Sequence, residues 1–526
     1  MKRNTESCRR LCGSWRHGLP TALLSVSDKT GLAAFARGLQ RLGYELFATG
    51  STLKVIEDAA LDARPVSELT GFPEMMDGRI KTLHPGVHAG ILARRDKPEH
   101  LAALAEHGLR QIDLVCCNLY PFVDTVHKPD ATFEEAIEQI DIGGPTMIRA
   151  AAKNHESVVV IVRPQRYSEI LGALHEATLD LEARRRLAAE AFAHTSAYDA
   201  WIAAYLRRGE RNGFPPEISI AGSLAEPLKY GENEHQKAAF YRLGPDAAGI
   251  GGARQVQGGP PGFNNLQDAS AAFQLVMDYA RPAAAIIKHM NPCGLAVADE
   301  ISIAYRMAYE CDRVAAFGGV VAVNRPLDRA TAEQIVQIVT HMVVAPDILD
   351  ETHDVLARRK NMIVLVAQPA RNGLFDLDVR SVPGGLLVQE WDRARFDRAT
   401  AKTVTRRAPT EAEWEQLGLA WTAVKHVKSN AIVLFKEGSA VGVGAGQMSR
   451  VEAVELAVQR AGDRSRGSVM ASDAFFPFAD GLEAGIRAGV TAAIQPGGSV
   501  KDAEVIAAAD DAGIAMVMTG QRHFKH

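Results

Sequence analysis

The stretch Ala284-Ala285-Ile286-Ile287-Lys288-His289 places a lysine and a histidine directly after an apolar run. A second run, Ala420-Trp421-Thr422-Ala423-Val424, leads into Lys425-His426 in the same way. We expect each pair to lie where a buried element reaches a cleft, and the repetition favours a duplicated fold. Histidine titrates near neutral pH and burial lowers the pKa of a lysine, so such a pair can accept a proton and stabilise developing negative charge.

The chain is long enough for several packed domains, because its 526 residues exceed what one hydrophobic core supports. Its hydrophobic fraction of 47% and charged fraction of 23% are typical of soluble globular proteins. The net charge of -4 argues against a protein that binds nucleic acid through its overall charge. No apolar stretch approaches the roughly 20 residues of a membrane helix, so neither a membrane segment nor a membrane partner is expected.

The cysteine pattern favours a reducing cytoplasm, because the six cysteines show neither paired C-x-x-C motifs nor disulfide-scaffold density. Residues 1–20 are basic but lack an apolar core, so they are interpreted as a disordered extension and not as a secretory signal. Cys8 with Cys12, and His84 with His88, are the candidate metal pairs. Neither is expected to bind metal, because the cysteines lie in the extension and a Pro-Gly pair argues against a regular helix between the histidines.

Short apolar runs alternate with amphipathic stretches in the first part of the chain, which predicts an α/β fold with a parallel sheet covered on both faces. The predicted strands are residues 22–26, 44–48, 112–117 and 158–162, with helices over 32–42 and 181–206. Ligands are expected at the carboxyl ends of these strands. The predicted domains are 21–214 and 215–526, with a linker over 207–216 and two repeats at roughly 217–375 and 376–526 in the second domain.

Two loops that follow predicted strands carry hydroxyl groups and free backbone donors. Ser25-Val26-Ser27-Asp28-Lys29-Thr30-Gly31 follows the first strand, and Ala48-Thr49-Gly50-Ser51-Thr52 follows the second. Each loop opens a helix, where backbone N–H groups bind anions. The sequence therefore predicts a phosphate cradle, although GxxxxGK[ST] is absent and the cradle is no Walker loop.

Further polar groups are predicted near this cradle. They come from GRIKTLHP at residues 78–85, from NLYPF at 118–122, and from a helix that starts with DIGG at 141–144 and carries Lys153. A site lined by Lys81, Tyr120, Asp141 and Lys153 suits addition and dehydration chemistry at polarised carbonyl groups. Taken singly, each of these residues fits equally well as a surface charge or a satisfied core polar group.

The second half contains polar and Gly/aromatic segments without structural periodicity, which favours binding or catalysis over core packing. They include KYGENEHQ at 229–236, PGFNNL at 261–266, KHMNPCG at 288–294, AFGG at 316–319, KHVKSNA at 425–431, GQMSR at 446–450 and SDAFFPF at 472–478. With SVSDKTG, GRIKTLHP, CNLYPF, DIGG and AAKNH from the first half, they follow one another in order.

On these motifs, residues 21–526 resemble the bifunctional purine-biosynthesis family that carries phosphoribosylaminoimidazolecarboxamide (AICAR) formyltransferase and inosinate cyclohydrolase. The resemblance implies a methylglyoxal-synthase-like parallel-sheet domain, then a transformylase half of two cytidine-deaminase-like α/β repeats. It implies 10-formyltetrahydrofolate as cosubstrate, formyl transfer to AICAR, dehydrative closure of formyl-AICAR to inosinate, and a homodimer with transformylase sites at its interface. No catalytic metal is expected, because the HxE and PCxxC signatures of zinc deaminases are missing.

The family motifs also imply site residues. For the cyclohydrolase these are Ser27, Lys29, Thr49, Gly50, Arg79, Lys81, Thr82, Asn118, Tyr120, Asp141 and Lys153. For the transformylase they are Lys229, Tyr230, Asn265, Lys288, His289, Phe317, Gly318, Asn430, Phe475, Asp480 and Arg522, with His526 nearby. His289 is the expected proton acceptor, while Lys288 and Asn430 are expected to stabilise charge.

Three positions depart from the family pattern, namely Glu234 where proline is usual, Pro383 where glycine is usual, and His341 near a usual acidic residue. Two other readings stay open at this stage. A zinc deaminase would bind stoichiometric zinc, and a nucleotide-sensing protein built on the same cradles would show no turnover. The expected function is therefore the last two steps of purine synthesis, in the order formyl transfer and ring closure.

Overall fold

The computed structural model of the chain describes residues 19–76, 78–128, 130–208, 213–244, 247–369 and 377–526. They form two compact units, one ending at Gly222 and the other beginning at Ser223. The predicted extension, with Cys8 and Cys12, falls almost entirely outside the described residues, as does the middle of the predicted linker. Throughout the described segments, each helix is too short or too polar to cross a membrane.

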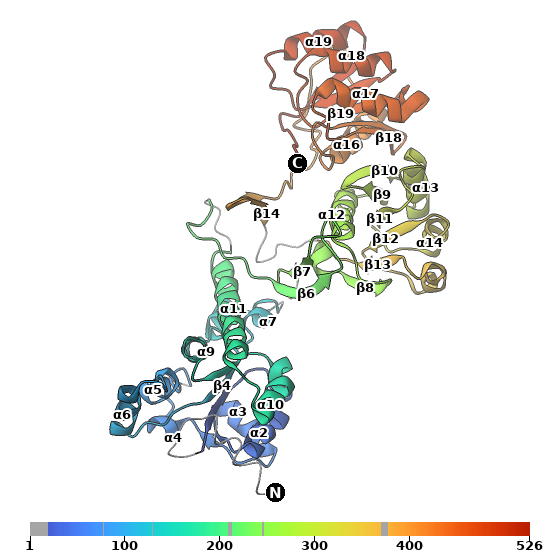
Figure 1. Ribbon diagram of the computed structural model, residues 1–526. Coiled ribbons are helices and arrows are strands. Elements are labelled where there is room, and N and C mark those ends of the chain that lie inside the picture. The colour runs from blue at the N-terminus through green and yellow to red at the C-terminus, as the bar shows by residue number, and fades with distance from the viewer. Residues whose placement is uncertain (1–18, 77, 129, 209–212, 245–246, 370–376) are drawn as a thin grey trace. The chain divides into compact units, whose positions relative to one another are not determined.

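The first unit is built on a parallel sheet that contains β4 (Figure 1). Its described strands have the order β3-β2-β1-β4-β5. The strands are β1 (Thr21–Ser25), β2 (Glu45–Ala48), β3 (Arg64–Pro65), β4 (Leu114–Cys117) and β5 (Val159–Ile161). The helices are α2 (Leu32–Arg41), α3 (Gly50–Asp58), α4 (Ser67–Thr70), α5 (Pro85–Leu92), α6 (Pro98–Glu106), α7 (Phe122–Val126), α8 (Phe133–Glu138), α9 (Gly143–Lys153), α10 (Tyr167–Glu176) and α11 (Leu181–Leu206). The predicted strands and helices are confirmed, with small shifts at their ends.

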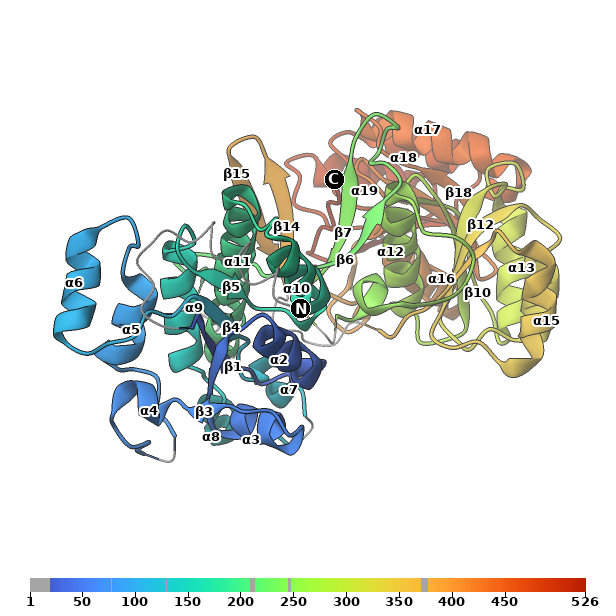
Figure 2. The ribbon, with the colours of Figure 1, turned by 60° about the horizontal axis from the view of Figure 1, so that its bottom comes forward.

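The strand order creates a switch point between β1 and β4. The chain runs outward from β1 to β2 and β3, and then returns to the other side of β1 to form β4 and β5. Right-handed crossovers therefore place α2 and α3 on one face of the sheet and α9 on the other. Accordingly, Phe35 of α2 stacks on Tyr167 of α10 at 4.2 Å, whereas α9 packs with α5 and α11 (Figure 2).

One local prediction was wrong. The Pro85-Gly86 pair does not prevent a helix, because α5 begins at Pro85 itself. Proline is tolerated at the first position of a helix, where its missing N–H costs no hydrogen bond. His84 is the N-cap, and its Nδ1 accepts a hydrogen bond from the Gly86 N–H at 3.0 Å.

The second unit contains a mixed sheet of twelve strands, counted over the described residues. Its strands are β8 (Arg254–Gln257), β9 (Ala283–Lys288), β10 (Asn291–Val297), β11 (Gly319–Val323), β12 (Thr340–Ala345), β13 (Ile363–Val366), β16 (Lys402–Thr403), β17 (Ile432–Lys436), β18 (Ser439–Gly444), β19 (Val469–Ser472), β20 (Ala492–Gln495) and β21 (Ala515–Met518). The α-helices are α12 (Phe263–Met277), α13 (Ile301–Cys311), α14 (Arg329–Ile335), α15 (His353–Leu356), α16 (Glu411–Val424), α17 (Arg450–Ala461), α18 (Ala479–Arg487) and α19 (Asp502–Asp511). Two separate hairpins are β6 (Ser223–Leu228) with β7 (Ala238–Arg242), and β14 (Leu377–Val382) with β15 (Gly385–Glu390).

The predicted duplication is confirmed by the connectivity. One repeat runs α12-β9-β10-α13-β11-α14-β12-α15-β13, and the other runs α16-β17-β18-α17-β19-α18-β20-α19-β21. In each, an antiparallel hairpin is followed by one antiparallel and then two parallel pairings. The repeats join where β10 pairs with β18 through Ala296 and Ser439.

The two Lys-His pairs, however, are not copies of each other. Lys288 ends β9 and His289 lies in the β9–β10 turn, whereas Lys425 and His426 follow helix α16 and precede β17. In the duplicated arrangement, the counterpart of the β9–β10 turn is Glu437-Gly438, between β17 and β18. The repetition in sequence was therefore a coincidence, although the duplication that it suggested exists.

A continuous core joins the repeats on one face of the sheet. Residues of α12 and α16 pack there with residues from strands of both repeats. On the opposite face, each repeat has a core of its own, under α13 to α15 in the first and under α17 to α19 in the second. The shared core makes the two repeats one cooperative body.

The end of α12 is tied to the end of α16 by a cluster around the partly buried Asp278 carboxylate. Asp278 Oδ2 lies 2.9 Å from Lys425 Nζ and 2.8 Å from His426 Nε2, and the lysine and histidine side chains are less than one-tenth exposed. Nearby, the Tyr279 hydroxyl donates to the Leu419 carbonyl oxygen at 3.0 Å. Lys425 and His426 therefore have a structural role, because their contacts hold the two repeats together.

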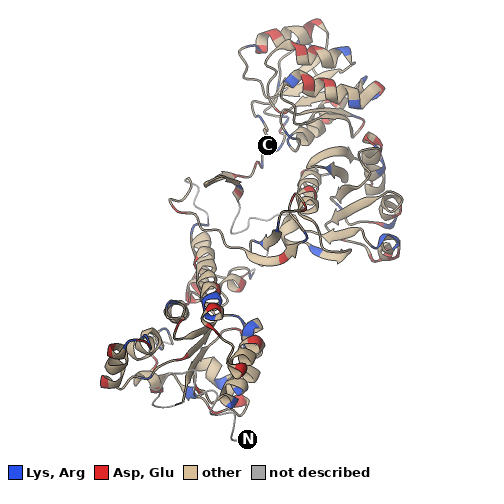
Figure 3. Cartoon of the chain, viewed as in Figure 1, with Lys and Arg blue, Asp and Glu red and all other residues tan. Residues whose placement is uncertain are grey.

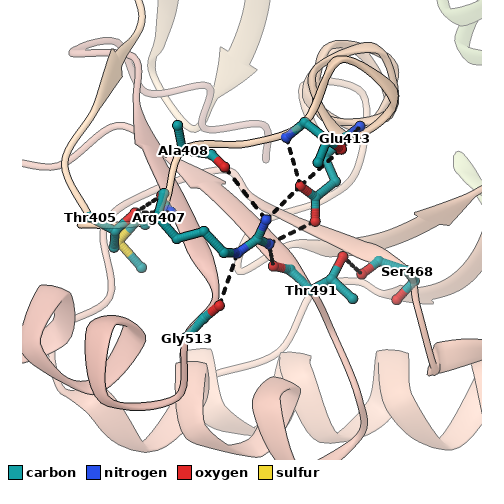
Figure 4. Close-up of polar contacts among 9 residues, drawn as sticks. Thr405, Arg407, Ala408, Glu413, Ser468, Thr491 and Gly513 are labelled. Atoms are coloured by element: carbon teal, nitrogen blue, oxygen red, sulfur yellow. Dashed lines mark hydrogen bonds and ion pairs between the residues drawn. The ribbon is translucent and has the colours of Figure 1, made fainter.

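The start of α16 is fixed by Arg407 (Figure 4). Its guanidinium makes two hydrogen bonds to Glu413, at 2.7 and 2.9 Å, and donates to the Gly513 carbonyl at 2.9 Å and to that of Thr491. Glu413 also completes a capping box with Thr410. Burial acts to raise the pKa of Glu413, but these hydrogen bonds outweigh it and lower the pKa to about 2. Both ends of α16 are thus anchored by charge.

The cluster predicts how stability depends on pH. Burial lowers the pKa of His426 to about 4, and the hydrogen bond that its imidazole donates to Asp278 only partly opposes this. Between pH 6.5 and 4 the unfolded chain therefore binds more protons at this histidine than the folded chain does. Folding stability contributed by His426 is present above pH 6.5 and is lost as the pH falls toward 4.

We expect His426→Gln to reduce this acid-side loss, because glutamine keeps a polar contact with Asp278 but does not titrate. The measurement is the urea unfolding midpoint at pH 7 and pH 5, followed by tryptophan emission, for wild type and variant. Equal shifts of the midpoint in the two proteins would contradict the assignment.

Candidate functional site

The loops after β1 and β4 are joined at the switch point of the first unit. The Oδ1 atom of buried Asn118 accepts hydrogen bonds from the N–H groups of Ser27, at 2.6 Å, and Asp28, at 2.9 Å. The loop after β2 joins them through Ser25 and Thr49, whose hydroxyl oxygens are 2.9 Å apart. Because α3 starts at Gly50, its N-terminal N–H groups add a positive field suited to an anion.

Lysines and a carboxylate complete this cradle. Lys81 Nζ lies 3.4 Å from the Tyr120 hydroxyl, and the Gly144 N–H donates to Asp141 Oδ1 at 2.8 Å. Burial raises the pKa of Asp141, although the hydrogen bond from the Gly144 N–H and the charge of Lys81 both act to lower it. Burial likewise lowers the pKa of Lys29; Asp28 opposes this change and Lys81 adds to it. A carboxyl and an amine whose pKa values are moved toward neutrality suit proton transfer.

Thr82 also belongs to this cradle, because a Cβ on Gly143 would lie 2.6 Å from its hydroxyl oxygen. The structure thus brings together Ser27, Lys29, Thr49, Gly50, Lys81, Thr82, Asn118, Tyr120 and Asp141. Two other predicted residues make no described side-chain contact with this set. Arg79 forms an exposed ion pair with Glu138, and Lys153 ends α9, about 15 Å along the helix from Gly143.

A second constellation surrounds Lys288 in the second unit. Lys288 Nζ donates to the Phe317 carbonyl oxygen at 2.7 Å. A Cβ on Gly318 would lie 3.4 Å from that nitrogen and 3.3 Å from the His341 ring. Gly318 therefore lets the lysine and His341 approach the same backbone, and the departure at His341 lies beside a predicted catalytic residue.

His289 occupies a strained turn. His289 and Met290 have φ values of 52° and 64°, although neither is glycine. Such two-residue turns normally carry Asn-Gly, since both central residues need positive φ. Asp268 of α12 supports the turn, because its Oδ1 accepts the Met290 N–H at 2.6 Å. Burial raises the pKa of Asp268, although this hydrogen bond and the charges of His289 and Lys288 act to lower it.

The second repeat contributes Asn430 next to this turn. The Lys428 N–H donates to Asn291 Oδ1 at 3.0 Å, which holds the segment carrying Asn430 against the residue that follows the turn. Asn430 is oriented at both ends of its amide. Its Oδ1 accepts from Arg450 at 2.8 Å, and its Nδ2 donates to the Gln447 carbonyl at 2.9 Å. Arg450 is in turn held by an ion pair with fully buried Asp473.

Sequence reasoning did not select Asp268, Asn291, Arg450 or Asp473. Asp268 follows the predicted Asn265 by one helical turn, and Arg450 and Asp473 lie inside the quoted motifs GQMSR and SDAFFPF. Each becomes visible only when the topology brings distant segments together, since 22 residues separate Asp268 from Met290 and 23 separate Arg450 from Asp473.

The remaining predicted residues lie at the edges of the second unit. Asn265 caps α12, where its Oδ1 accepts the Gly262 N–H at 3.1 Å, and Lys229 Nζ lies 5.5 Å from the Tyr230 ring centroid. The carboxyl-terminal segment returns to Asn430, because the Ser429 N–H donates to the Lys525 carbonyl at 2.9 Å. Also in this unit are Phe475, Asp480 at the start of α18, Arg522 over the Phe524 ring, and His526, whose carbonyl binds Arg380. Among the described contacts, none joins Lys229 or Tyr230 to Lys288.

Candidate metal ligands are dispersed. In the described part of the chain, His, Cys, Asp and Glu form no group of three that could hold a metal ion. Cys293 instead donates its thiol to the Ile286 carbonyl at 3.3 Å, and burial raises its pKa to about 12. Glu234 and Pro383, the other two positions that depart from the family pattern, are at the surface. Glu234 is exposed, and Pro383 lies in the β14–β15 turn.

Two family descriptions match the chain. "AICARFT/IMPCHase bienzyme" matches residues 151–460, and "MGS-like domain" matches residues 31–146. The chain is 51% identical to the bifunctional purine biosynthesis protein PurH of Roseobacter denitrificans, over 97% of this chain and 99% of that protein. It is 51% identical to that of Parvibaculum lavamentivorans, over 96% and 97%, and 48% identical to that of Bacillus subtilis, over 96% and 99%. The chain therefore belongs to the AICARFT/IMPCHase bienzyme family, with an MGS-like domain in its first unit.

Proposed function

We propose that the chain carries out the last two steps of purine synthesis, formyl transfer in the second unit and ring closure in the first. Family membership over nearly the full length supports both activities. The observation that carries the assignment of the first step is the exposed His289 in a strained turn beside Lys288. Positive φ at non-glycine residues costs about 1–3 kcal/mol each and persists where function requires it.

In the transfer step, the amine of AICAR attacks the formyl carbon of 10-formyltetrahydrofolate. A new N–C bond forms, the bond from carbon to N10 breaks, and tetrahydrofolate leaves with a proton on N10. His289 accepts the amine proton, while Lys288 and the Asn430 amide stabilise the oxyanion of the tetrahedral intermediate. Arg450 and Asp473 keep Asn430 in place, and Asp268 keeps His289 in its turn.

In the second step, the carboxamide nitrogen of formyl-AICAR attacks the formyl carbon and water leaves. Lys81 and Tyr120 polarise the formyl oxygen, and Asp141, with its raised pKa, exchanges protons with nitrogen and leaving water. Ser27, Lys29, Thr49 and Gly50 hold the phosphate at the start of α3. Lys153 at the far end of α9 and Arg79 in its ion pair with Glu138 make no described side-chain contact with these residues, so neither is given a step in closure. Arg522 anchors an anionic group in the transfer reaction.

The assembly is proposed to be a cytoplasmic homodimer that needs no catalytic metal. Apolar side chains on both hairpins support a dimer, since Leu224, Tyr241, Leu386 and Leu387 are each at least half exposed. Isolated two-stranded hairpins are marginally stable unless covered. In such a dimer, Lys229 and Tyr230 of one copy would reach the Lys288 site of the other copy. The unit boundary at residues 222–223 supports separate domains for the two activities.

The two histidines should behave differently in the transfer reaction. His289→Ala should lower the rate of formyl transfer by roughly 10²–10⁴-fold, the usual contribution of a general base. Closure of supplied formyl-AICAR should be unchanged. His426→Gln is the matched control and should keep transfer within a few fold, measured by tetrahydrofolate release. Comparable losses in both variants would show that His289 is not the proton acceptor.

Asp268 should act through the turn and not through substrate. Asp268→Asn removes the charge but retains the shape, so kcat for transfer should fall about tenfold, the effect of one weakened hydrogen bond to a charged group. The KM for AICAR should hardly change, and Gln274→Ala on the same helix should leave both constants alone. If KM rose while kcat stayed constant, Asp268 would be a binding residue instead.

The two activities should separate physically. A fragment of residues 19–222 should close supplied formyl-AICAR without folate, because it contains the whole cradle and its own sheet. In the full chain, Lys81→Ala should stop closure and let formyl-AICAR accumulate, detected by chromatography. A soluble, folded fragment without turnover would mean that closure requires the second unit.

A further inference from the structure

The first unit has a groove that lies apart from the phosphate cradle. Its volume is about 970 Å³, and it runs along α9 between α5 and α11. Of the residues assigned above to the cyclohydrolase, Lys153 alone among those described lines this groove. Leu83 and His84 border it and also border a smaller hollow next to Lys81. The groove therefore adjoins the proposed site without being part of it.

Three cations line the groove without acidic partners. Arg149 and Lys153 of α9 and Arg185 of α11 are exposed, and none of them forms an ion pair within the described residues. No Asp or Glu occurs among the described lining residues. Elsewhere, basic and acidic residues are interspersed on the helices (Figure 3). Two like charges at i and i+4, such as Arg149 and Lys153, destabilise a helix unless a counter-charge is supplied.

The floor of the groove is suited to a flat ring. It is built from small side chains, including Ala150, Ala188 and Ala189. At one end Phe192 is 39% exposed, and the Arg149 guanidinium carbon lies 5.4 Å from its ring centroid. His88 also lines the groove. A ligand that offers both a ring and negative groups would satisfy all of these features.

We propose that this groove binds a small aromatic polyanion, with its ring on the alanine floor beside Phe192 and its negative groups at Arg149, Lys153 and Arg185. Guanidinium groups pair bidentately with phosphate or carboxylate, and stack on aromatic rings. Two kinds of molecule share this chemistry, a purine nucleotide and a pteroylglutamate. The site goes beyond the proposed function, because neither catalytic step described above uses Arg149 or Arg185.

The test compares two neighbouring arginines of α11 in the full chain. Arg185→Ala removes a lining cation, whereas Arg186→Ala removes an exposed arginine that pairs with Glu182 and does not line the groove. Inosine monophosphate and folic acid triglutamate are titrated separately by calorimetry, and the number of sites per chain is counted. Far-ultraviolet circular dichroism verifies that each variant is folded.

We expect Arg185→Ala to weaken one class of sites at least tenfold, and Arg186→Ala to leave both titrations as in wild type. Loss confined to inosine monophosphate identifies a nucleotide site, and loss confined to the folate identifies a pteroylglutamate site. Identical titrations for wild type and Arg185→Ala would overturn the proposal. So would a change of oligomeric state in sedimentation without a change in either titration, because the groove would then be a contact between copies.

Discussion

The partly buried carboxylate of Asp278 makes the contact on which the second unit depends. It ends α12 of the first repeat and holds Lys425 and His426 at the end of α16 of the second. Removing the Asp278 carboxylate would leave the buried Lys425 ammonium group without its ion-pair partner, at a cost of about 3–5 kcal/mol. Because α12 and α16 share one core, this contact also sets how the repeats meet. Beyond His426, the chain passes directly to Lys428 and Asn430 beside the His289 turn.

The strained turn distinguishes the two repeats and supports the proposal that the first repeat carries the chemistry. The equivalent hairpin of the other repeat turns through Glu437 and Gly438, with φ values of 49° and 81°. There, glycine takes one of the two left-handed positions, so part of the strain is absent. In the first repeat, His289 and Met290 take both positions, and Asp268 supplies the hydrogen bond that keeps them there. The strain thus presents an imidazole at the surface next to Lys288.

Much of the fold could be predicted from the sequence, because alternating apolar runs and helical periodicity are local signals. The strands of the first unit and the cradle loops after them are examples. The expectation that Lys425-His426 lies at a cleft could not be corrected locally, since its partner Asp278 lies 148 residues before His426. The helix at Pro85 was missed because proline breaks helix interiors but starts helices readily. Likewise, the separation of Lys153 from Asp141 follows from the length of α9 and not from residue type.

The central claim is that His289 faces substrate while His426 is structural. The most direct measurement is the nuclear magnetic resonance spectrum of the full chain with ¹³C-labelled histidines, assigned through His289→Ala and His426→Gln and recorded while AICAR is added. The account predicts that AICAR shifts the His289 signal, and that the His426 signal stays in place and remains that of a neutral imidazole down to about pH 4. A His426 signal that moves with AICAR, with a His289 signal that does not, would contradict it.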